Sequence, residues 1–252
     1  FVWEYPRRDE AVEVRFGGAV RAEVNGRLEY RHENYEAVKA VPYDVPVVGY
    51  RTGTVNALRL WGAEPARDDF VCSATNRSDC LKTIAYKHAV EMISAVLYPD
   101  DSTHEGRALR LKQHYFLASA SLQAIVADCK RRGVPLDRLH EHVAVHINDT
   151  HPALAVPELM RILVDEEGFD WDEAWRITVA TISYTNHTVM PEALETWPVD
   201  IFSALLPRIF IIVNEINERF CRQLWQRYPG DWERIRAMAV IADGSVHMAH
   251  LA

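Results

Sequence analysis

The chain has 252 residues, of which 48% are hydrophobic and 25% are charged, and its formal net charge is −8. This is the composition of a globular protein and excludes a disordered or collagen-like chain. The negative net charge argues against binding of nucleic acid through bulk electrostatics, and no apolar run approaches the length of a membrane helix. We therefore expect neither nucleic acid nor a membrane as a partner.

Four cysteines are spread along the chain without a C-x-x-C pair: Cys72, Cys80, Cys129 and Cys221. Such sparse cysteines favour reduced thiols in the cytoplasm over a disulfide scaffold. The chain begins with Phe1 rather than Met and ends in an apolar run over residues 246–252. We therefore expect both ends to be cut ends of a longer protein.

Residues 1–62 predict a β-rich region. Strand-like segments are found at residues 12–16, 21–24, 27–30 and 55–61. The second and third flank Asn25-Gly26, which is the strongest short signal for a β-hairpin. Pro42 and Pro46 are expected to interrupt the chain between strands.

Residues 79–132 predict helices, because the apolar positions there recur with a helical period. The first helix is expected to end at Pro99, and its apolar residues include Leu81 and Ile84 on one face. The second is expected over about 108–130. Its apolar stripe comprises Leu111, Tyr115, Ala118, Leu122 and Ile125.

Residues 142–252 predict alternating strands, helices and loops, which indicates an α/β core. The predicted elements are a strand at 142–147, a helix that opens at Pro157, a helix at 171–181 capped by Asp170, a long helix at 207–228 and a helix capped by Asp231. The proline near a helix start and the Asp caps are typical signals for helix beginnings.

Three segments concentrate polar and titratable residues between apolar ones: Pro99–Asp101, Asn148–His151, and Tyr184–Thr188 with Pro191–Glu195. A strand that ends in Asn-Asp-Thr-His places these side chains at the carboxyl edge of a sheet, where open α/β folds bind ligands. The alternative is that Asp149 and Thr150 are turn residues that bond to nearby backbone.

His187 is the leading candidate for ligand binding. A neutral imidazole donates from one nitrogen and accepts at the other, which suits a sugar hydroxyl, and a carboxylate such as Asp149 could fix its tautomer. The alternative is a histidine satisfied within the core. Glu192 and Glu195 share one face if helical, and alone they are more typical of a solvated surface.

No metal site is expected. His140, His142 and His146 lie close in sequence, but no Cys or His set with structural-zinc spacing accompanies them. The sequence also contains no GxGxxG, Walker or G-x-S-x-G motif, which argues against the common nucleotide and serine-hydrolase sites.

Read in order, nine segments carry a resemblance to a known family. They are Pro42–Tyr50, Asn56–Trp61, Leu97–Asp101, Glu105–Gln113, Asn148–Pro152, Pro157–Leu163, Tyr184–Thr188, Pro191–Pro198 and Leu206–Arg208. With them the sequence resembles the α-glucan phosphorylases, which act on glycogen, starch or maltodextrin. The match extends from about residue 40 to the end of the chain.

The resemblance implies an α/β fold that is part of the N-terminal domain of a two-domain, glycosyltransferase-B-type architecture. It implies phosphorolysis of terminal α-1,4-linked glucosyl units to glucose 1-phosphate, with retention, by an intact enzyme that is a cytoplasmic homodimer. Pyridoxal 5′-phosphate and the catalytic residues are then expected in the C-terminal domain. The fragment alone is expected to be inactive, with no catalytic or cofactor-binding residue of its own.

The resemblance also implies a set of substrate-binding residues: Asp101, Asp149, His151, His187, Thr188 and Glu195. Asp101 corresponds to the acidic residue of a mobile gating loop, and Asp149 with His151 to the acidic surroundings of the glucose pocket. His187 corresponds to the histidine near the primary hydroxyl of the glucosyl unit, with Thr188 beside it and Glu195 near the same pocket.

Several positions depart from the regulated animal members of the family. Paired arginines that hold a nucleotide phosphate are replaced by Ala127 and Asp128, and gating-loop aromatic residues by Thr103 and His104. The resemblance therefore implies an unregulated, bacterial-type enzyme without AMP activation. Residues 64–80 also depart from the family pattern, in the segment that contacts the other subunit.

Two alternatives come from other functional classes. One is a carbohydrate-binding or oligomerisation module that performs no chemistry. The other is a glycoside hydrolase that uses two carboxylates, such as Asp149 and Glu195. Only phosphorolysis requires inorganic phosphate, so a phosphate requirement would separate the hydrolase from the phosphorylase.

Overall fold

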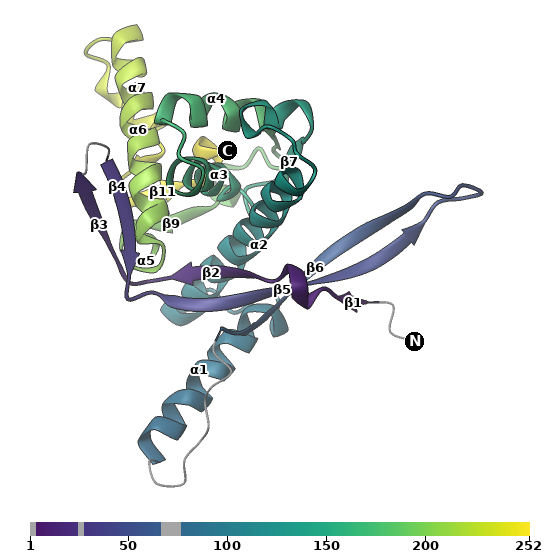
Figure 1. The fold of residues 1–252 in the computed structure, drawn as a ribbon. Helices are drawn as coiled ribbons and strands as arrows, with labels where there is room; N and C mark the ends of the chain where they lie inside the picture. The colour runs from purple at the N-terminus through teal and green to yellow at the C-terminus, as the bar shows by residue number, and fades with distance from the viewer. Residues whose placement is uncertain (1–3, 25–27, 67–76) are drawn as a thin grey trace. The chain divides into compact units, whose positions relative to one another are not determined.

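The computed structural model describes residues 4–24, 28–66 and 77–252 as a mixture of helices and sheets (Figure 1). The chain divides into two compact units, and each is described by itself. The first unit comprises residues 1–16 and 36–120, and the second comprises residues 17–35 and 121–252. The division falls inside one long helix, α2.

The first unit is built on an antiparallel sheet. Its elements are β1 (Tyr5–Pro6), the 3₁₀ turn η1 (Arg8–Glu10), β2 (Val12–Phe16), β5 (Glu36–Val48), β6 (Val55–Pro65), α1 (Arg77–Ala95) and the start of α2 (His104–Arg131). Strand β5 pairs with β6 along its length, and on its other side with β2 and then β1. The predicted strands at 12–16 and 55–61 are therefore confirmed.

The expectation that Pro42 and Pro46 interrupt the chain is wrong, because both lie inside β5. The amide of Gly49 donates to the carbonyl of Thr54, so the odd-numbered residues of β5 bond to β6. Pro42 and Pro46 are even-numbered, so their backbone N and C=O groups point away from β6. On that side, the Pro42 carbonyl accepts from the Arg7 amide at 2.8 Å. A proline is tolerated where no partner strand needs its missing N–H.

Helix α1 packs against the sheet through its second half. Val90 and Ile93 are buried, the Ser94 hydroxyl accepts from the Ala63 amide at 3.0 Å, and the Tyr86 hydroxyl donates to the Ala37 carbonyl at 2.7 Å. By contrast, the face that contains Leu81 and Ile84 is exposed.

Four of the five residues of the apolar stripe predicted for α2 are buried: Leu111, Tyr115, Ala118 and Leu122. The fifth, Ile125, is half-buried. In the first unit, the Phe16 ring meets the Tyr115 ring edge-on, with 5.9 Å between the ring centroids.

The second unit contains a hairpin and two further small sheets. Its strands are β3 (Ala19–Val24), β4 (Leu28–Glu33), β7 (Val145–Asn148), β8 (Ile182–Thr185), β9 (Thr196–Pro198), β10 (Ile241–Ala242) and β11 (Ser245–His247). Strands β3 and β4 form the predicted antiparallel hairpin, whose Asn25-Gly26 turn lies outside the described residues. Strands β7 and β8 are parallel, and β10, β11 and β9 are antiparallel.

The helices of the second unit alternate with these strands. They are η2 (Leu136–Glu141), α3 (Ala155–Arg161), the π-helical turn η3 (Ile162–Glu166), α4 (Trp171–Thr181), η4 (Pro191–Ala193), α5 (Val199–Leu205), α6 (Pro207–Arg227), α7 (Trp232–Met238) and α8 (Met248–Leu251). The two predicted caps are confirmed: Asp170 accepts from the Glu173 amide at 2.9 Å, and Asp231 from the Arg234 amide at 3.1 Å.

Two boundaries differ from the prediction. The strand expected from residue 142 begins at Val145, because η2 and its following turn occupy the residues before it. The helix expected to open at Pro157 begins at Ala155. Amides in the first turn of a helix have no partner inside the helix, so a proline is tolerated throughout that turn and does not mark its first residue.

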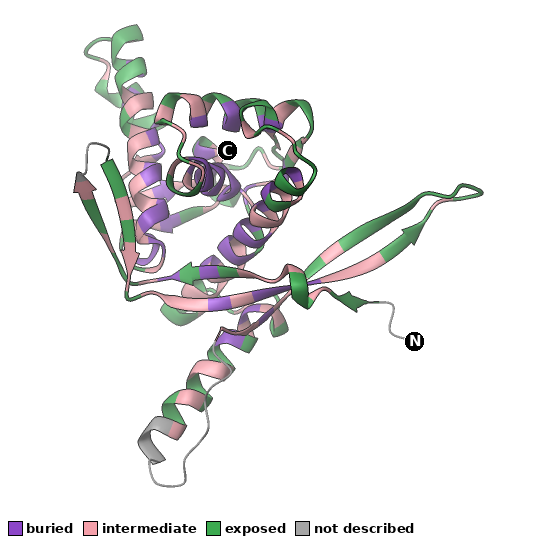
Figure 2. Ribbon diagram, in the orientation of Figure 1, coloured by how far each residue is buried: buried purple, intermediate pink, exposed green. Residues whose placement is uncertain are grey.

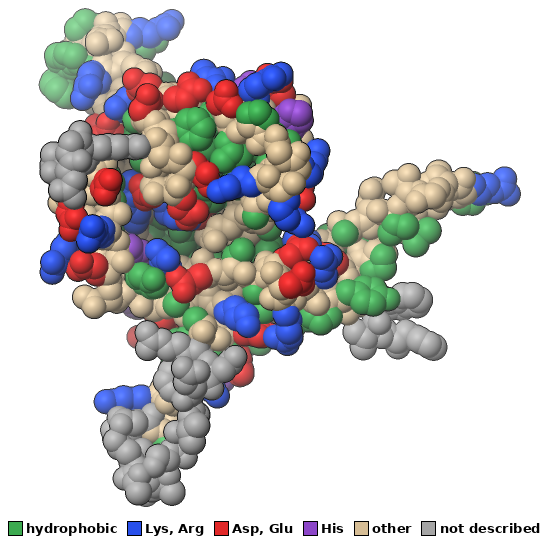
Figure 3. All heavy atoms as spheres, viewed as in Figure 1, with side chains coloured by type: hydrophobic (Ala, Val, Ile, Leu, Met, Phe, Trp, Pro, Cys, Tyr) green, Lys and Arg blue, Asp and Glu red, His purple; other side chains and the backbone are tan. Residues whose placement is uncertain are grey.

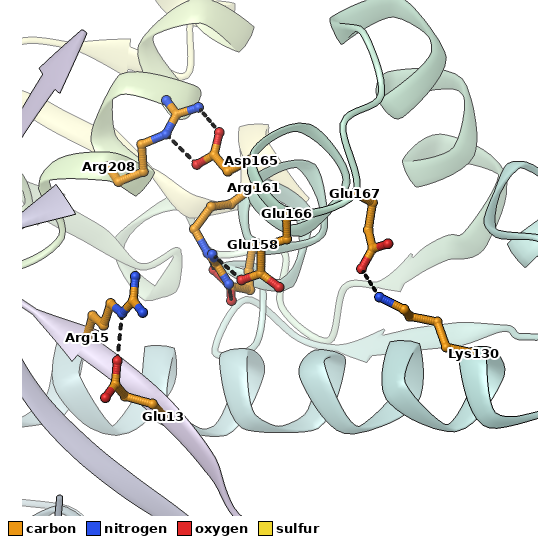
Figure 4. Close-up of polar contacts among 9 residues, drawn as sticks. All are labelled: Glu13, Arg15, Lys130, Glu158, Arg161, Asp165, Glu166, Glu167 and Arg208. Atoms are coloured by element: carbon orange, nitrogen blue, oxygen red, sulfur yellow. Dashed lines mark hydrogen bonds and ion pairs between the residues drawn. The ribbon is translucent and has the colours of Figure 1, made fainter. Parts of the chain in front are cut away.

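The core of the second unit lies between α3 and α6, which pack together (Figure 2). Two buried charges there are satisfied by bidentate ion pairs: Glu158 with Arg161 at 2.8 Å, and Arg208 with Asp165 at 2.7 Å (Figure 4). The Arg208 guanidinium also lies 3.7 Å from the centre of the Tyr30 ring, which ties the β3–β4 hairpin to α6.

The thiols are not all reduced in the structure. Cys129 and Cys221 are free, but Cys80 is disulfide-bonded, contrary to the expectation of reduced cysteines. Cys72 lies outside the described residues. Among the helices that the structure describes, none is both long and apolar enough to cross a membrane.

Candidate functional site

The candidate site lies where β7 and β8 end. Asn148 is the last residue of β7 and pairs in parallel register with Thr185, the last residue of β8. The Asp149 amide then donates to the Thr185 carbonyl at 2.9 Å, which continues the pairing beyond the strands. The parallel register therefore brings the Asn148–His151 and Tyr184–Thr188 segments together at one sheet edge.

His187 bonds across this edge to Asn148. Its Nε2 donates to the Asn148 amide oxygen, because a carbonyl-type oxygen can only accept. In the neutral ring this leaves Nδ1 with a free lone pair to accept a hydrogen bond from a ligand. His187 is exposed, so the alternative of a core histidine is wrong. The expectation that a carboxylate such as Asp149 fixes the tautomer is also wrong, because the hydrogen-bond partner of His187 is Asn148.

Asp149 is held in a strained local turn. Its φ is +66°, in the left-handed region that Asp tolerates better than most residues, and its Oδ1 accepts from the Thr150 amide at 2.7 Å. Thr150 is buried, which anchors the turn. The turn-forming interpretation of Asp149 is therefore confirmed, and the turn fixes this half-buried carboxylate beside the sheet edge.

The charge of Asp149 also acts on Tyr184. Burial raises the pKa of the Tyr184 hydroxyl above its ordinary value, and the nearby Asp149 carboxylate raises it further. Both effects disfavour the phenolate, since a buried second negative charge would be poorly solvated and repelled. Tyr184 therefore remains a neutral hydrogen-bonding group at this edge.

Thr188 and the residues around it form a tight loop after β8. The Thr188 amide donates to Asn186 Oδ1 at 3.0 Å, and Asn186 Nδ2 donates back to the Thr188 carbonyl at 2.6 Å. The Thr188 hydroxyl accepts from the Met190 amide at 3.2 Å. These bonds shape the loop that presents His187.

The remaining predicted residues are placed less closely. His151 is exposed at the end of the β7 turn. Glu195 is half-buried just before β9, in a different sheet, and its carbonyl accepts from the Met248 amide at 3.1 Å. Asn148, Asp149 and His187 thus lie together at the sheet edge, while the Glu195 backbone is bonded to the start of α8.

Asp101 belongs to the first unit, where it lies in the turn before α2. Its carboxylate accepts from Arg110 at 2.6 Å, and its carbonyl accepts from Arg107 at 3.0 Å. The turn rests on Gly106, since a Cβ at that position would lie 1.7 Å from the Asp100 carbonyl oxygen. Only glycine fits at position 106, and this allows the turn to pass close to the start of α2.

A cavity of about 480 Å³ lies in the second unit, within the usual range for small-molecule pockets. Its lining includes Trp171, Trp175, Tyr184, Arg219 and His250, but none of the six predicted substrate-binding residues. The Arg219 guanidinium lies 5.0 Å from the centre of the Trp171 ring and pairs with Asp172 at 2.7 Å. The cavity therefore shares Tyr184 with the sheet-edge site, but none of the predicted substrate-binding residues.

The described residues do not fit pyridoxal phosphate. A Schiff-base site needs a lysine in a pocket, and none lines the cavity. Lys112 and Lys130 are held in ion pairs with Glu36 at 3.0 Å and Glu167 at 2.7 Å. No chemical step through this cofactor is assigned to these residues.

The histidine cluster does not form a metal site in the described part of the chain. No group of three or more His, Cys, Asp or Glu side chains there could hold an ion. His146 Nε2 instead bonds to the Thr185 hydroxyl at 2.6 Å, which links β7 to β8.

Sequence reasoning missed the role of Asn148. The sequence shows that Asn148 lies at the end of a predicted strand. It does not show the strand register, which sets Asn148 opposite Thr185 and within reach of His187. The signal in the sequence is that both strand ends contain Asn, Thr and His close together, in Asn148–His151 and in Thr185–Thr188.

Comparisons with known proteins cover the whole chain. The family model for carbohydrate phosphorylases matches residues 1–252. The chain is 56% identical over 252 residues to a glycogen phosphorylase of Bacillus subtilis (strain 168), 45% identical over 255 residues to glycogen phosphorylase 2 of Dictyostelium discoideum, and 44% identical over 260 residues to the muscle glycogen phosphorylase of Oryctolagus cuniculus. These alignments include 99–100% of this chain but only 26–30% of each relative. The chain therefore belongs to the carbohydrate phosphorylase family and spans less than a third of the length of these relatives.

Proposed function

We propose that this chain is part of an α-glucan phosphorylase. Such an enzyme cleaves the terminal α-1,4-linked glucosyl unit of glycogen or a related glucan with inorganic phosphate, and releases glucose 1-phosphate with retention. The observation that carries the proposal is the family match over all 252 residues, together with relatives named glycogen phosphorylases.

The sheet-edge site contributes substrate binding to this proposal. His187 is exposed and its Nε2 is occupied by Asn148, which leaves Nδ1 for a donor hydroxyl such as the primary hydroxyl of a glucosyl unit. Asp149, Thr188, His151, Glu195 and Asp101 complete the proposed set. These groups place the sugar, and placement is a large part of catalysis when the reacting groups come from elsewhere.

The remaining parts of the proposal concern the full-length protein. We place pyridoxal phosphate, the phosphate-binding groups and the catalytic residues in a C-terminal domain of a two-domain, glycosyltransferase-B-type enzyme. The proposal also includes a homodimer in the cytoplasm and an isolated fragment 1–252 without activity.

Two alternatives lack a supporting observation in the structure. A two-carboxylate hydrolase would use Asp149 and Glu195, but the Asp149 carboxylate accepts from the Thr150 amide and Glu195 lies just before β9, outside the β7–β8 edge. A binding module derived from the same fold would match the same relatives, and no observation on the described residues favours it over an enzyme.

The test is a phosphate-dependence assay on the full-length protein. Maltoheptaose is incubated with and without inorganic phosphate, and glucose 1-phosphate and free sugars are measured. We expect glucose 1-phosphate in the α configuration, formed only with phosphate. Free glucose or maltose formed without phosphate would indicate a hydrolase, and binding without turnover would indicate a module.

A further inference from the structure

Asn148 supports the ring of His187 from the end of β7. Side chains alternate along this strand, and Asn148 lies on its exposed face, since Ile147 before it is buried. The His187 Nε2 donates to the Asn148 amide oxygen. Within the described part of the chain this is the one hydrogen bond of the His187 side chain, so the direction of its Nδ1 depends on Asn148.

The backbone around Asn148 is held by bonds that do not involve His187. Asn148 lies opposite Thr185 in the parallel register, and the next amide, that of Asp149, donates to the Thr185 carbonyl at 2.9 Å. The Asp149 turn is closed by the bond from the Thr150 amide at 2.7 Å. The Thr185 hydroxyl is bonded to His146 Nε2 at 2.6 Å. Asn148 is therefore a fixed support for the more exposed ring.

The partner of His187 is uncharged, although charged groups are common on this protein. Acidic and basic side chains lie close together on the face of the second unit that Figure 3 shows. The carboxylate next in sequence, Asp149, is bonded to the Thr150 amide instead. A carboxylate at Nε2 would favour the imidazolium ion, whose two nitrogens both donate. An amide oxygen adds no charge, so Nδ1 of the neutral ring keeps its lone pair. The order Asn148-Asp149 thus suits a histidine that accepts a hydrogen bond.

We propose that Asn148 is a positioning residue that makes His187 the acceptor for the primary hydroxyl of the glucosyl unit. The choice of this hydroxyl rests on the proposed function. Asn148 acts through the imidazole and does not touch the sugar itself. A residue that only supports the sheet edge would affect all sugars alike, whereas Asn148 should affect only sugars that donate a hydrogen bond at this carbon.

The experiment uses the full-length protein in the direction of glucan synthesis, with maltoheptaose as acceptor. The donors are α-glucose 1-phosphate and its 6-deoxy analogue, and kcat/KM is obtained for each from the phosphate released. We expect Asn148→Ala to lower kcat/KM for glucose 1-phosphate roughly three- to tenfold, the scale of one hydrogen bond, and to change that for the 6-deoxy analogue much less. Asn148→Ala combined with His187→Ala should be no worse than His187→Ala alone.

Asn148→Asp is the second variant, because it keeps an acceptor at Nε2 but adds a charge. The ring should then be an imidazolium ion that donates from Nδ1. The 6-deoxy-6-fluoro analogue of glucose 1-phosphate tests this, since its fluorine accepts a hydrogen bond and cannot donate one. We expect Asn148→Asp to narrow the preference for glucose 1-phosphate over the fluoro analogue more than Asn148→Ala does.

The matched control is Thr185→Val, which removes the hydroxyl bonded to His146 on the same edge. It should leave the preference between the donors unchanged. Equal losses for both donors in Asn148→Ala would overturn the proposal, as would additive losses in the double variant. Calorimetry measures the binding of the same donors without turnover. A protein that shows the expected selective loss in binding but releases no phosphate would overturn the proposed function alone.

Discussion

The hydrogen bond from His187 to Asn148 determines which ring nitrogen is left for a ligand. In the full-length protein, His187→Ala should lower kcat/KM for maltoheptaose by roughly tenfold to a thousandfold, the range of a lost contact to a substrate hydroxyl in a catalytic site. Steady-state kinetics measures the effect, and circular dichroism checks the fold. An unaltered kcat/KM would remove His187 from the site.

Gly106 gives a second prediction at the scale of one residue. A methyl group there would lie 1.7 Å from the Asp100 carbonyl, so Gly106→Ala must displace the turn that carries Asp101. We expect a loss of about 1–3 kcal/mol in the free energy of unfolding, as for other overpacked positions. Gly53→Ala is the control, since nothing lies within 4 Å of its added methyl group. Equal melting temperatures for both variants would contradict the expected clash.

At the scale of elements, the β5–β6 hairpin carries a pH-dependent contact. Asp44 lies opposite Arg59 in the ladder, and the Arg59 hydrogen bonds hold the pKa of Asp44 below its ordinary value of 3.8. Because the pKa of Asp44 is lower in the folded than in the unfolded protein, its contact with Arg59 stabilises the folded state fully above the unfolded-state pKa. This stabilisation is lost as the pH falls through the folded-state pKa.

Asp44→Asn should therefore destabilise the hairpin by about 1 kcal/mol at neutral pH, the upper range for a cross-strand charge pair. The deficit relative to the unchanged protein should shrink as the pH falls below about 4. Hydrogen exchange of hairpin peptides, compared between the two proteins at each pH, measures this. Glu13→Gln, which removes the exposed pair with Arg15, is the control and should change little. A deficit that stays constant down to pH 2 would argue against the titration of Asp44.

Elements defined by local signals could be predicted from the sequence, but the register between strands could not. The caps at Asp170 and Asp231 act within one turn, so the sequence alone locates α4 and α7. The sequence does not predict that β5 contains Pro42 and Pro46. A strand tolerates proline only where the missing N–H would point away from a partner strand, and the register with β6 decides that. The His187–Asn148 contact was missed for the same reason, since it depends on the parallel register of β7 and β8.

At the scale of the whole molecule, the family resemblance implies paired arginines for a nucleotide phosphate at positions that Ala127 and Asp128 occupy in this chain. Asp128 stands at one of these positions and pairs with Arg131 at 3.2 Å and Arg132 at 3.4 Å, so a carboxylate faces the nearest guanidinium groups. We expect AMP to leave the activity of the full-length protein unchanged, because neither Ala127 nor Asp128 offers its phosphate a positive charge or a side-chain donor. Rates with and without AMP, at limiting phosphate, are the measurement. A several-fold activation would contradict this prediction.

The two prolines of β5 also bear on solubility. On the outer side of this strand, the described part of β1 pairs with Tyr43 and Asp44. An unpaired strand edge is a template on which another chain can add and begin aggregation. Pro46 faces the same side as this pairing and has no N–H to donate, so it interrupts the row of donors on that side of β5. Pro46→Val would restore the donor and leave a continuous apolar edge. A residue that sequence reasoning treats as a strand breaker would thus lower the tendency of this strand to add a further strand on that side.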